Sequence, residues 1–121
     1  MRICHLTTKD EWNHAQRLGR VEAASLSSDG FIHCSRFDQM ESVANRFYRG
    51  LGDLVLLVID TRLLDVEWRW EAACPPDGSQ AALDEGRFPH VYGAFPVGAV
   101  INAIDWVPDL EGSFTLPMAL S

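Results

Sequence analysis

The sequence has 121 residues, of which 47% are hydrophobic and 22% charged, and its formal net charge is -7. This length and composition predict one globular domain over residues 1–121 and exclude a disordered chain. An acidic domain with a single lysine and no basic run repels phosphate backbones, which excludes general nucleic-acid binding but not a small nucleotide. The three cysteines have no metal-finger spacing, and their low, odd number is typical of a reducing compartment. The sequence shows no signal peptide and no apolar run near ~20 residues. We therefore expect a cytoplasmic protein without a membrane span.

The chain begins with the pattern of a strand over residues 2–6, followed by a helix. Thr8 and Glu11 have the spacing of a capping box, in which each side chain satisfies a free N–H group of the other residue. Gly19 is expected to end this helix, because glycine adopts the left-handed conformation that closes many helices. His14 lies among polar neighbours of the helix and is expected on the surface.

An irregular segment is expected over residues 20–30, and residues 31–35 are expected to form a strand after the Asp29-Gly30 turn. A second capping box over residues 38–41 predicts another helix, which ends at Gly50. Its apolar residues recur at i, i+3, i+4 and i+7, the spacing of one helix face. They are Met40, Val43, Ala44 and Phe47.

The second half of the chain predicts strands. Residues 54–59 form an uninterrupted apolar run, which indicates a strand buried on both faces. Residues 66–71 alternate between apolar and charged side chains, as in a half-buried strand. A long loop is expected over residues 75–86, followed by strands over 90–92 and 97–107 and one more strand after Pro108. Two apolar residues, Trp106 and Phe114, are expected to be exposed and suited to an interface. Helices early and strands late indicate an α+β fold.

Three histidines and one carboxylate lie in or beside the predicted apolar strands. His5, His33 and His90 fall on three different strands, and Glu71 ends a fourth. Each histidine alone is explained by a hydrogen bond within the core, but together they favour a shared pocket. We therefore predict Glu71, His90 and His33 as catalytic candidates. No pair has the short spacing of many metal sites, so we predict no metal, although a metal-assisted hydrolase stays as an alternative.

Residues beside these histidines are the predicted ligand-binding groups. Ser35 shares a strand face with His33, whereas Cys34 points to the other face and forms no nucleophilic pair with it. Arg36 is the nearest cation for a phosphate, or a solvated residue at the helix entry. Tyr92 stacks on a base or fills the core. The predicted ligand-binding set is His5, Phe31, Ser35, Arg36 and Tyr92.

The segments GFIHCS, LVLLVID and FPHVYG resemble a family of small bacterial proteins catalogued as a domain of unknown function, over residues 5–107. The chain is also similar to the ADP-ribosyltransferase fold of the poly(ADP-ribose) polymerase and diphtheria-toxin branch. There, a first strand carries histidine and then threonine, as in His5-Leu6-Thr7. A glycine-led strand, a helix ending in tyrosine and an apolar strand follow, as here. The catalytic glutamate of that branch falls at Phe88, counted back from Tyr92.

The resemblance implies two early helices packed on a mostly antiparallel twisted sheet or split barrel. It also implies that NAD, ADP-ribose or a phosphorylated nucleotide binds, with NAD as a substrate. In this interpretation His5 hydrogen-bonds the ribose or a phosphate, and Glu71 or His90 orients a hydroxyl or acts as the base. RNA 2′-phosphotransferases of this fold use arginine and histidine in place of the glutamate. The alternative is a non-catalytic ligand-binding or accessory module, which the missing glutamate favours.

Overall fold

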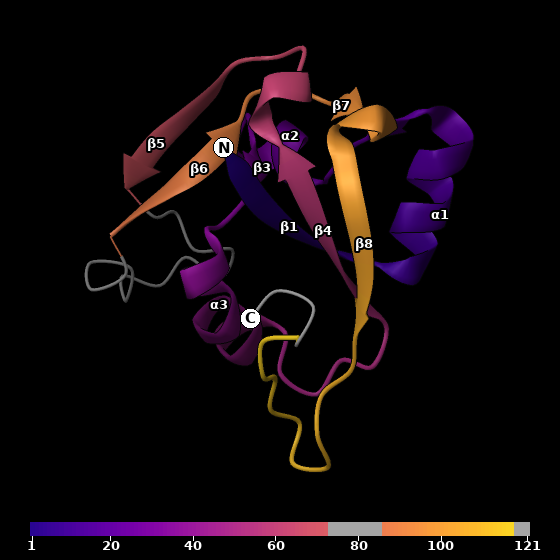
Figure 1. Ribbon diagram of the computed structural model, residues 1–121, viewed down its shortest axis with the longest axis vertical. Helices are drawn as coiled ribbons and strands as arrows, with labels where there is room; N and C mark the ends of the chain where they lie inside the picture. Colours follow the sequence, from indigo (N-terminus) through magenta and orange to yellow (C-terminus); the bar gives the residue numbers. More distant parts are fainter. Residues whose placement is uncertain (73–85, 118–121) are drawn as a thin grey trace.

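Short helices and antiparallel strands alternate along the chain (Figure 1), and the computed structural model describes residues 1–72 and 86–117. The predicted loop over 75–86 therefore falls almost entirely outside the described residues. In chain order the elements are β1 (Arg2–Thr8), α1 (Lys9–Leu18), β2 (Arg20–Val21), α2 (Ser25–Ser28), β3 (Ile32–His33), η1 (Phe37–Gln39), α3 (Met40–Phe47), β4 (Leu54–Asp60), η2 (Thr61–Leu63), β5 (Trp68–Ala72), β6 (Arg87–Val91), β7 (Phe95–Pro96), η4 (Val97–Ala99) and β8 (Val100–Trp106).

The strand β4 is the centre of the fold. It lies between β1 and β8 in an antiparallel sheet, and all seven of its residues are buried. Its alternate side chains enter two separate apolar clusters, one containing Val55, Leu57 and Ile59 and the other Leu54, Leu56 and Val58. The prediction of a strand buried on both faces is confirmed, because the uninterrupted apolar run leaves neither face for water.

A second three-stranded sheet, in the order β3-β6-β5, continues from the edge of the first. The two sheets are joined where Cys4 of β1 and Ser35 exchange both backbone hydrogen bonds, each 2.8 Å long. The strands β2 and β7 form a small third pair. All of these pairs are antiparallel, and the chain is a single domain that combines few helices with antiparallel sheets, in line with the predicted α+β class.

The helices α1 and α3 lie apart in Figure 1, and they pack on opposite faces of the β1-β4-β8 sheet. Ala15 of α1 joins the cluster on one face, whereas Met40 and Ala44 of α3 join the other. Thr8 caps α1 by accepting a hydrogen bond from the Glu11 backbone, as predicted. The Glu11 carboxylate does not complete the capping box with Thr8. It accepts a hydrogen bond from the Thr7 hydroxyl instead.

Several predicted boundaries were wrong. Residues 20–30 are not irregular, because β2 pairs with the distant β7 and residues 25–28 form α2. The strand expected over 31–35 is shortened to Ile32–His33, and α3 begins after a 3-10 turn rather than at Asp38 and ends at Phe47. Residues 97–99 form a 3-10 turn before β8. No further strand follows Pro108 within residues 108–117.

The expectation that Trp106 and Phe114 are exposed was also wrong. Each is 3% exposed, and their rings pack edge to face in the α3 cluster. Trp106 anchors the tail because its indole N–H donates to the Thr115 carbonyl.

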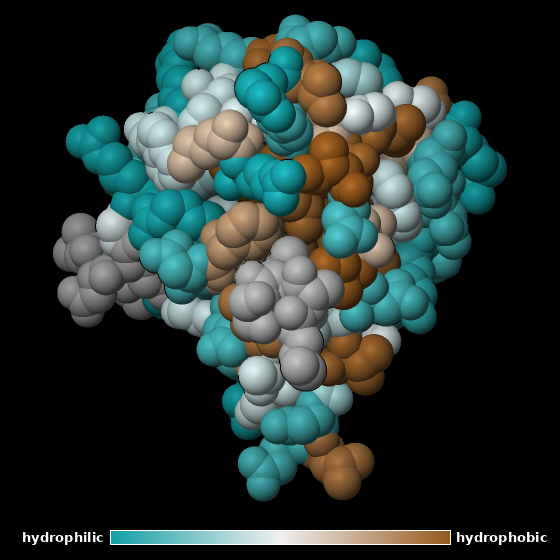
Figure 2. Space-filling model, viewed as in Figure 1, coloured by the Kyte–Doolittle hydropathy of each residue, from teal (hydrophilic) through white to brown (hydrophobic). Residues whose placement is uncertain are grey.

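The apolar band in the middle of Figure 2 covers the region of β4 and β8, where Ile101 and Val107 are exposed. Within the described residues, no helix is long and apolar enough to cross a membrane.

Candidate functional site

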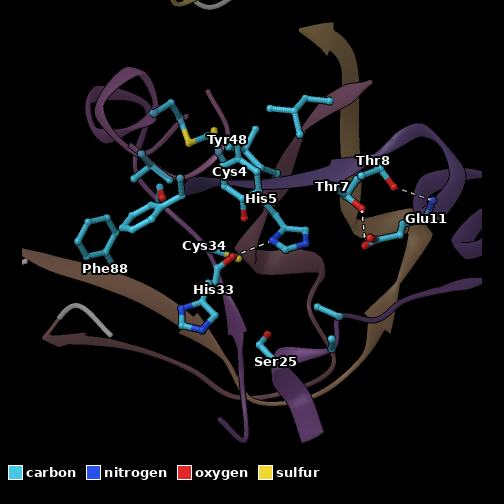
Figure 3. A pocket seen from close by; sticks show the side chains of 18 of the residues that line it. Cys4, His5, Thr7, Thr8, Glu11, Ser25, His33, Cys34, Tyr48 and Phe88 are labelled. Atoms are coloured by element: carbon cyan, nitrogen blue, oxygen red, sulfur yellow. Dashed lines mark hydrogen bonds between the residues drawn. The ribbon is translucent and has the colours of Figure 1, made fainter. Parts of the chain in front are cut away.

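A cavity of about 610 Å³ lies along β1, beyond the point where the two sheets join. The five consecutive residues 4–8 of β1 line it, together with the start of α1, the α2 region, β3 and the apolar stripe of α3. Figure 3 shows the imidazole of His5 between the Thr7–Glu11 pair and the side chains of His33 and Ser25. The cavity therefore has a polar end built by β1, α1, α2 and β3, and an apolar side built by α3.

His5 is held as a neutral hydrogen-bond acceptor toward the cavity. Its Nδ1 lies 2.7 Å from the His33 carbonyl oxygen, and the side chain is 7% exposed. Because a carbonyl oxygen only accepts, Nδ1 carries the proton and Nε2 has the lone pair. Burial lowers the pKa of His5 below its ordinary value, and this effect outweighs the opposing hydrogen bond to His33. No other described residue hydrogen-bonds Nε2.

His90 is fixed by a carboxylate in the same manner. Its Nδ1 lies 2.9 Å from Oε1 of Glu71, and the same oxygen accepts a short hydrogen bond from the Tyr92 hydroxyl. An ionised carboxylate only accepts, so Nδ1 of His90 is the donor and the lone pair of Nε2 is left for a ligand. Burial lowers the pKa of His90, against the opposing hydrogen bond to Glu71. The hydrogen bond from Tyr92, and then that from His90, lowers the pKa of Glu71.

Aromatic packing restricts the His90 ring further. Phe31 stacks on it with ring centroids 3.9 Å apart and an interplanar angle of 14°. On the far side of the hydrogen-bonded group, the Arg69 guanidinium lies 4.8 Å from the centroid of the Tyr92 ring. Arg69 is itself paired with Glu67 at 2.9 Å. The imidazole is therefore positioned by a stacked ring on one face and by a carboxylate at one edge.

His33 and Asp29 form a second histidine–carboxylate pair at the cavity. Nε2 of His33 lies 2.8 Å from Oδ2 of Asp29, and both residues line the cavity. The ring centroids of His33 and His90 are 5.7 Å apart. Asp29 is placed by the turn at Gly30, which has a positive φ of 86°. His33 and His90, each paired with a carboxylate, are therefore neighbours at the same cavity.

Acidic residues line the cavity, but no Lys or Arg does. Glu11 and Asp29 line it, whereas none of the ten Lys and Arg residues of the sequence does, and all ten lie within the described residues. Arg36 lies outside the lining, where its Nε atom pairs with Asp38 at 2.9 Å and its guanidinium lies 5.8 Å from the centroid of the Trp70 ring. Any ligand charge in the cavity is therefore met by carboxylates and not by a cation of this chain.

The predicted site residues divide into two groups, with Arg36 belonging to neither. His5, His33, Ser35 and His90 line the cavity. Behind that surface lie the residues that contact His90 directly or through its partners, which are Phe31, Glu71 and Tyr92, and Arg36 lies apart. Sequence reasoning missed the cavity roles of Thr7, Glu11 and Asp29, which have ordinary capping and turn patterns. The only available signal was their closeness in sequence to His5 and His33.

Burial disfavours the thiolate form of the two cysteines at the cavity. Cys4 and Cys34 are both free and buried. Burial raises the pKa of the Cys4 thiol to about 12, and the pKa of Cys34 is raised for the same reason. Both thiols therefore stay protonated near neutral pH. No group of three or more His, Cys, Asp or Glu side chains among residues 1–72 and 86–117 has an arrangement that holds a metal ion.

Comparisons with known proteins identify the family. The chain is similar to protein CC0527 of Caulobacter crescentus, whose crystal structure aligns with a TM-score of 0.82 at 32% identity and covers 99% of this chain and 98% of that one. The solution structure of CC0527 aligns with a TM-score of 0.73 at 32% identity, over 95% and 92% of the two chains. No curated protein matches. Residues 6–103 match the model of a family described as a protein of unknown function, DUF952, and the chain belongs to that family.

Proposed function

We propose that this protein is an enzyme that binds a small organic molecule in the β1 cavity and uses His90 as a general base. The observation that carries this proposal is the arrangement of His90, which lines a cavity of about 610 Å³ while its Nδ1 is held by Glu71. A base needs its lone pair directed at the substrate and its other nitrogen fixed, and the Glu71 hydrogen bond supplies the second condition.

His90 acts by accepting a proton at Nε2 from a hydroxyl or N–H group of the ligand. The lowered pKa keeps the imidazole neutral and able to accept a proton near neutral pH. When Nε2 takes the proton, the imidazolium charge is stabilised by the Glu71 carboxylate 2.9 Å from Nδ1. His5 presents a second neutral Nε2 to the same ligand and orients it through a hydrogen bond.

The resemblance to the ADP-ribosyltransferase fold implies NAD, ADP-ribose or a phosphorylated nucleotide as the ligand, and the lining of the cavity favours one part of such molecules. Ribose hydroxyl groups are suitable donors to the two imidazole acceptors, and the apolar α3 side of the cavity accommodates a planar base. Phosphate groups have no Lys or Arg in the lining, so they must lie outside it. The proposed substrate is therefore a nucleoside-like molecule, or the nucleoside part of a nucleotide.

A second candidate function is a non-catalytic ligand-binding module. It is supported by Phe88, which lines the cavity at the position where the resemblance expects a catalytic glutamate. In this case His90 and His5 serve only as hydrogen-bond acceptors for the ligand. The resemblance to the ADP-ribosyltransferase fold stays a prediction under either function.

The test uses the matched variant His90→Asn. The amide nitrogen of Asn replaces Nδ1 as a donor to Glu71, but the variant has no counterpart of Nε2. We expect adenosine, ADP-ribose or NAD at millimolar concentration to shift the NMR resonances of His5 and His90 in the wild type. Turnover of NAD or ADP-ribose, followed by NMR of the products, should fall by roughly 100-fold or more in His90→Asn.

The control is His14→Asn, the same substitution on the exposed face of α1, which should leave binding and turnover unchanged. The enzyme proposal fails if His90→Asn and the wild type turn over the substrate equally. Binding by the wild type without any turnover supports the binding module instead. If none of the three compounds shifts cavity resonances, the nucleoside class is wrong.

A further inference from the structure

We infer that the β1 cavity selects ligands by charge and takes a small organic cation, a protonated amine attached to an apolar group. This inference goes beyond the proposed function: it depends on the same cavity being the binding site, but it names a cationic ligand in place of a neutral nucleoside. It names the chemical class of the group that enters the polar end, which is lined by Glu11, His5 and His33.

The first observation is the pairing of the carboxylates. Oε2 of Glu11 accepts a hydrogen bond from the Thr7 hydroxyl at 3.2 Å, and Oδ2 of Asp29 is paired with His33 at 2.8 Å. No other described residue hydrogen-bonds the side-chain oxygens Oε1 of Glu11 or Oδ1 of Asp29. Each carboxylate therefore retains an acceptor oxygen, and no Lys or Arg side chain lines the cavity to neutralise it.

The second observation is independent of the carboxylates. His5 and His90 are 7% and 2% exposed, and both line the cavity. Their Nδ1 atoms hydrogen-bond to oxygens that only accept, so each neutral ring offers an acceptor at Nε2. Neither Nε2 atom has a partner in the described parts of the chain. Among the described residues no buried side-chain nitrogen or oxygen is left without a partner, so both Nε2 atoms are accessible from the cavity. A ligand there can donate to them, and an ammonium group has three N–H donors.

The apolar side of the cavity explains the second part of the ligand. Met40, Val43 and Phe47 of α3 line it, together with Leu51 and Leu54. An alkyl or aryl substituent placed there removes apolar surface from water at about 25 cal/mol per Å². An anionic head group in the polar end would instead face Glu11 and Asp29 without a compensating cation. The net charge of -7 also favours the approach of a cation over that of an anion.

The test compares three probes with the same phenylalkyl body and different head groups. Phenylethylammonium, 2-phenylethanol and 3-phenylpropanoate are titrated into the full-length protein at low ionic strength and pH 7.5, and the dissociation constants are measured by NMR. We expect the ammonium compound to bind roughly tenfold more tightly than the alcohol, and the carboxylate to bind most weakly. Added salt should reduce the difference between the ammonium compound and the alcohol.

The variant Glu11→Gln identifies the group responsible. The amide oxygen still accepts the Thr7 hydrogen bond, and Thr8 still accepts from the backbone of residue 11, so the helix start is retained. The Kd of phenylethylammonium should rise about tenfold, whereas the Kd of 2-phenylethanol should not change. Glu111→Gln is the matched control, because it removes one exposed negative charge from a residue that does not line the cavity, and it should change neither constant.

Three outcomes would overturn the inference. If the alcohol binds as tightly as the ammonium compound, the cavity is a site but does not select cations, and the proposed function survives. If Glu11→Gln and Glu111→Gln weaken ammonium binding equally, the effect comes from net charge and not from this cavity. If none of the three probes perturbs the resonances of His5 or His90, the cavity is not a binding site for such molecules, and the inference is wrong. The titration with adenosine, ADP-ribose and NAD decides the proposed function separately.

Discussion

The stability of the fold should depend on pH through His5, and the variant His5→Asn isolates this dependence. The imidazole is 7% exposed, and its pKa in the folded state is lowered by burial. An asparagine amide at this position still donates to the His33 carbonyl, so the hydrogen bond of 2.7 Å has a replacement. The variant loses only the two outer ring atoms, which face the cavity, and should cost about 1 kcal/mol of unfolding free energy at pH 7.5.

The sign follows from the direction of the pKa shift. Because the folded-state pKa of His5 lies below the unfolded value of about 6.5, the unfolded chain binds the proton first as the pH falls. Below pH ~6.5 the wild type therefore loses up to about 1.4 kcal/mol per pH unit through His5, until the pH reaches the folded-state pKa. The variant does not have this loss. The initial advantage of the wild type should therefore shrink as the pH falls below about 6.5.

The measurement is urea unfolding of both proteins between pH 7.5 and pH 5.0, with the free energies compared at each pH. Taking the difference between the two proteins removes the contribution of the carboxylates, which is common to both. A difference that stays constant over this range would show that His5 is not buried as a neutral ring. A difference that grows in favour of the wild type at low pH would show that its folded-state pKa is raised, which contradicts the geometry.

Two further predictions concern the Tyr92–Glu71 hydrogen bond and the end of α1. In Tyr92→Phe the Glu71 carboxylate loses the hydrogen bond that contributes most to its lowered pKa. The pKa of Glu71, measured by a carbon-13 NMR titration, should therefore rise toward its ordinary value. An unchanged pKa would mean that the Tyr92 hydroxyl does not donate to Glu71. Gly19→Ala should lower the unfolding free energy by about 1 kcal/mol, because Gly19 ends α1 with a φ of 87° that disfavours any other residue. Gly98→Ala is the control. The φ of Gly98 is not positive, so this variant should cost much less in the same urea measurement.

The parts of the fold that the sequence predicted are those set by neighbouring residues. The apolar run of β4 and the Thr8 cap of α1 carry their own signals, and both were confirmed. The pair β2 and β7 was missed because Arg20 pairs with Pro96, and a two-residue strand has no periodicity of its own. Trp106 was misplaced because its burial comes from contacts with α3 and the tail, which no local pattern reports.

The site was predictable to a similar degree. Polar residues in apolar strands marked His5, His33 and His90, and the structure places all three at one cavity. The Glu71 carboxylate lies beside His90 because β5 pairs with β6, a relation that an alternating strand pattern suggests but does not fix. Glu11 has an ordinary helix-capping pattern, and only the antiparallel assembly shows that its carboxylate also faces the cavity.

The cavity lies where the two sheets separate after a single bridge, and a hydrogen bond of His5 takes the place of the next backbone pair. Cys4 and Ser35 exchange both backbone hydrogen bonds, so a continuing antiparallel ladder would next join Leu6 to His33. The carbonyl of His33 would then accept from the Leu6 N–H group. It accepts from Nδ1 of His5 instead, at 2.7 Å. The imidazole of His5, which lines the cavity, therefore also takes the hydrogen-bonding position that would have continued the pairing of the two sheets.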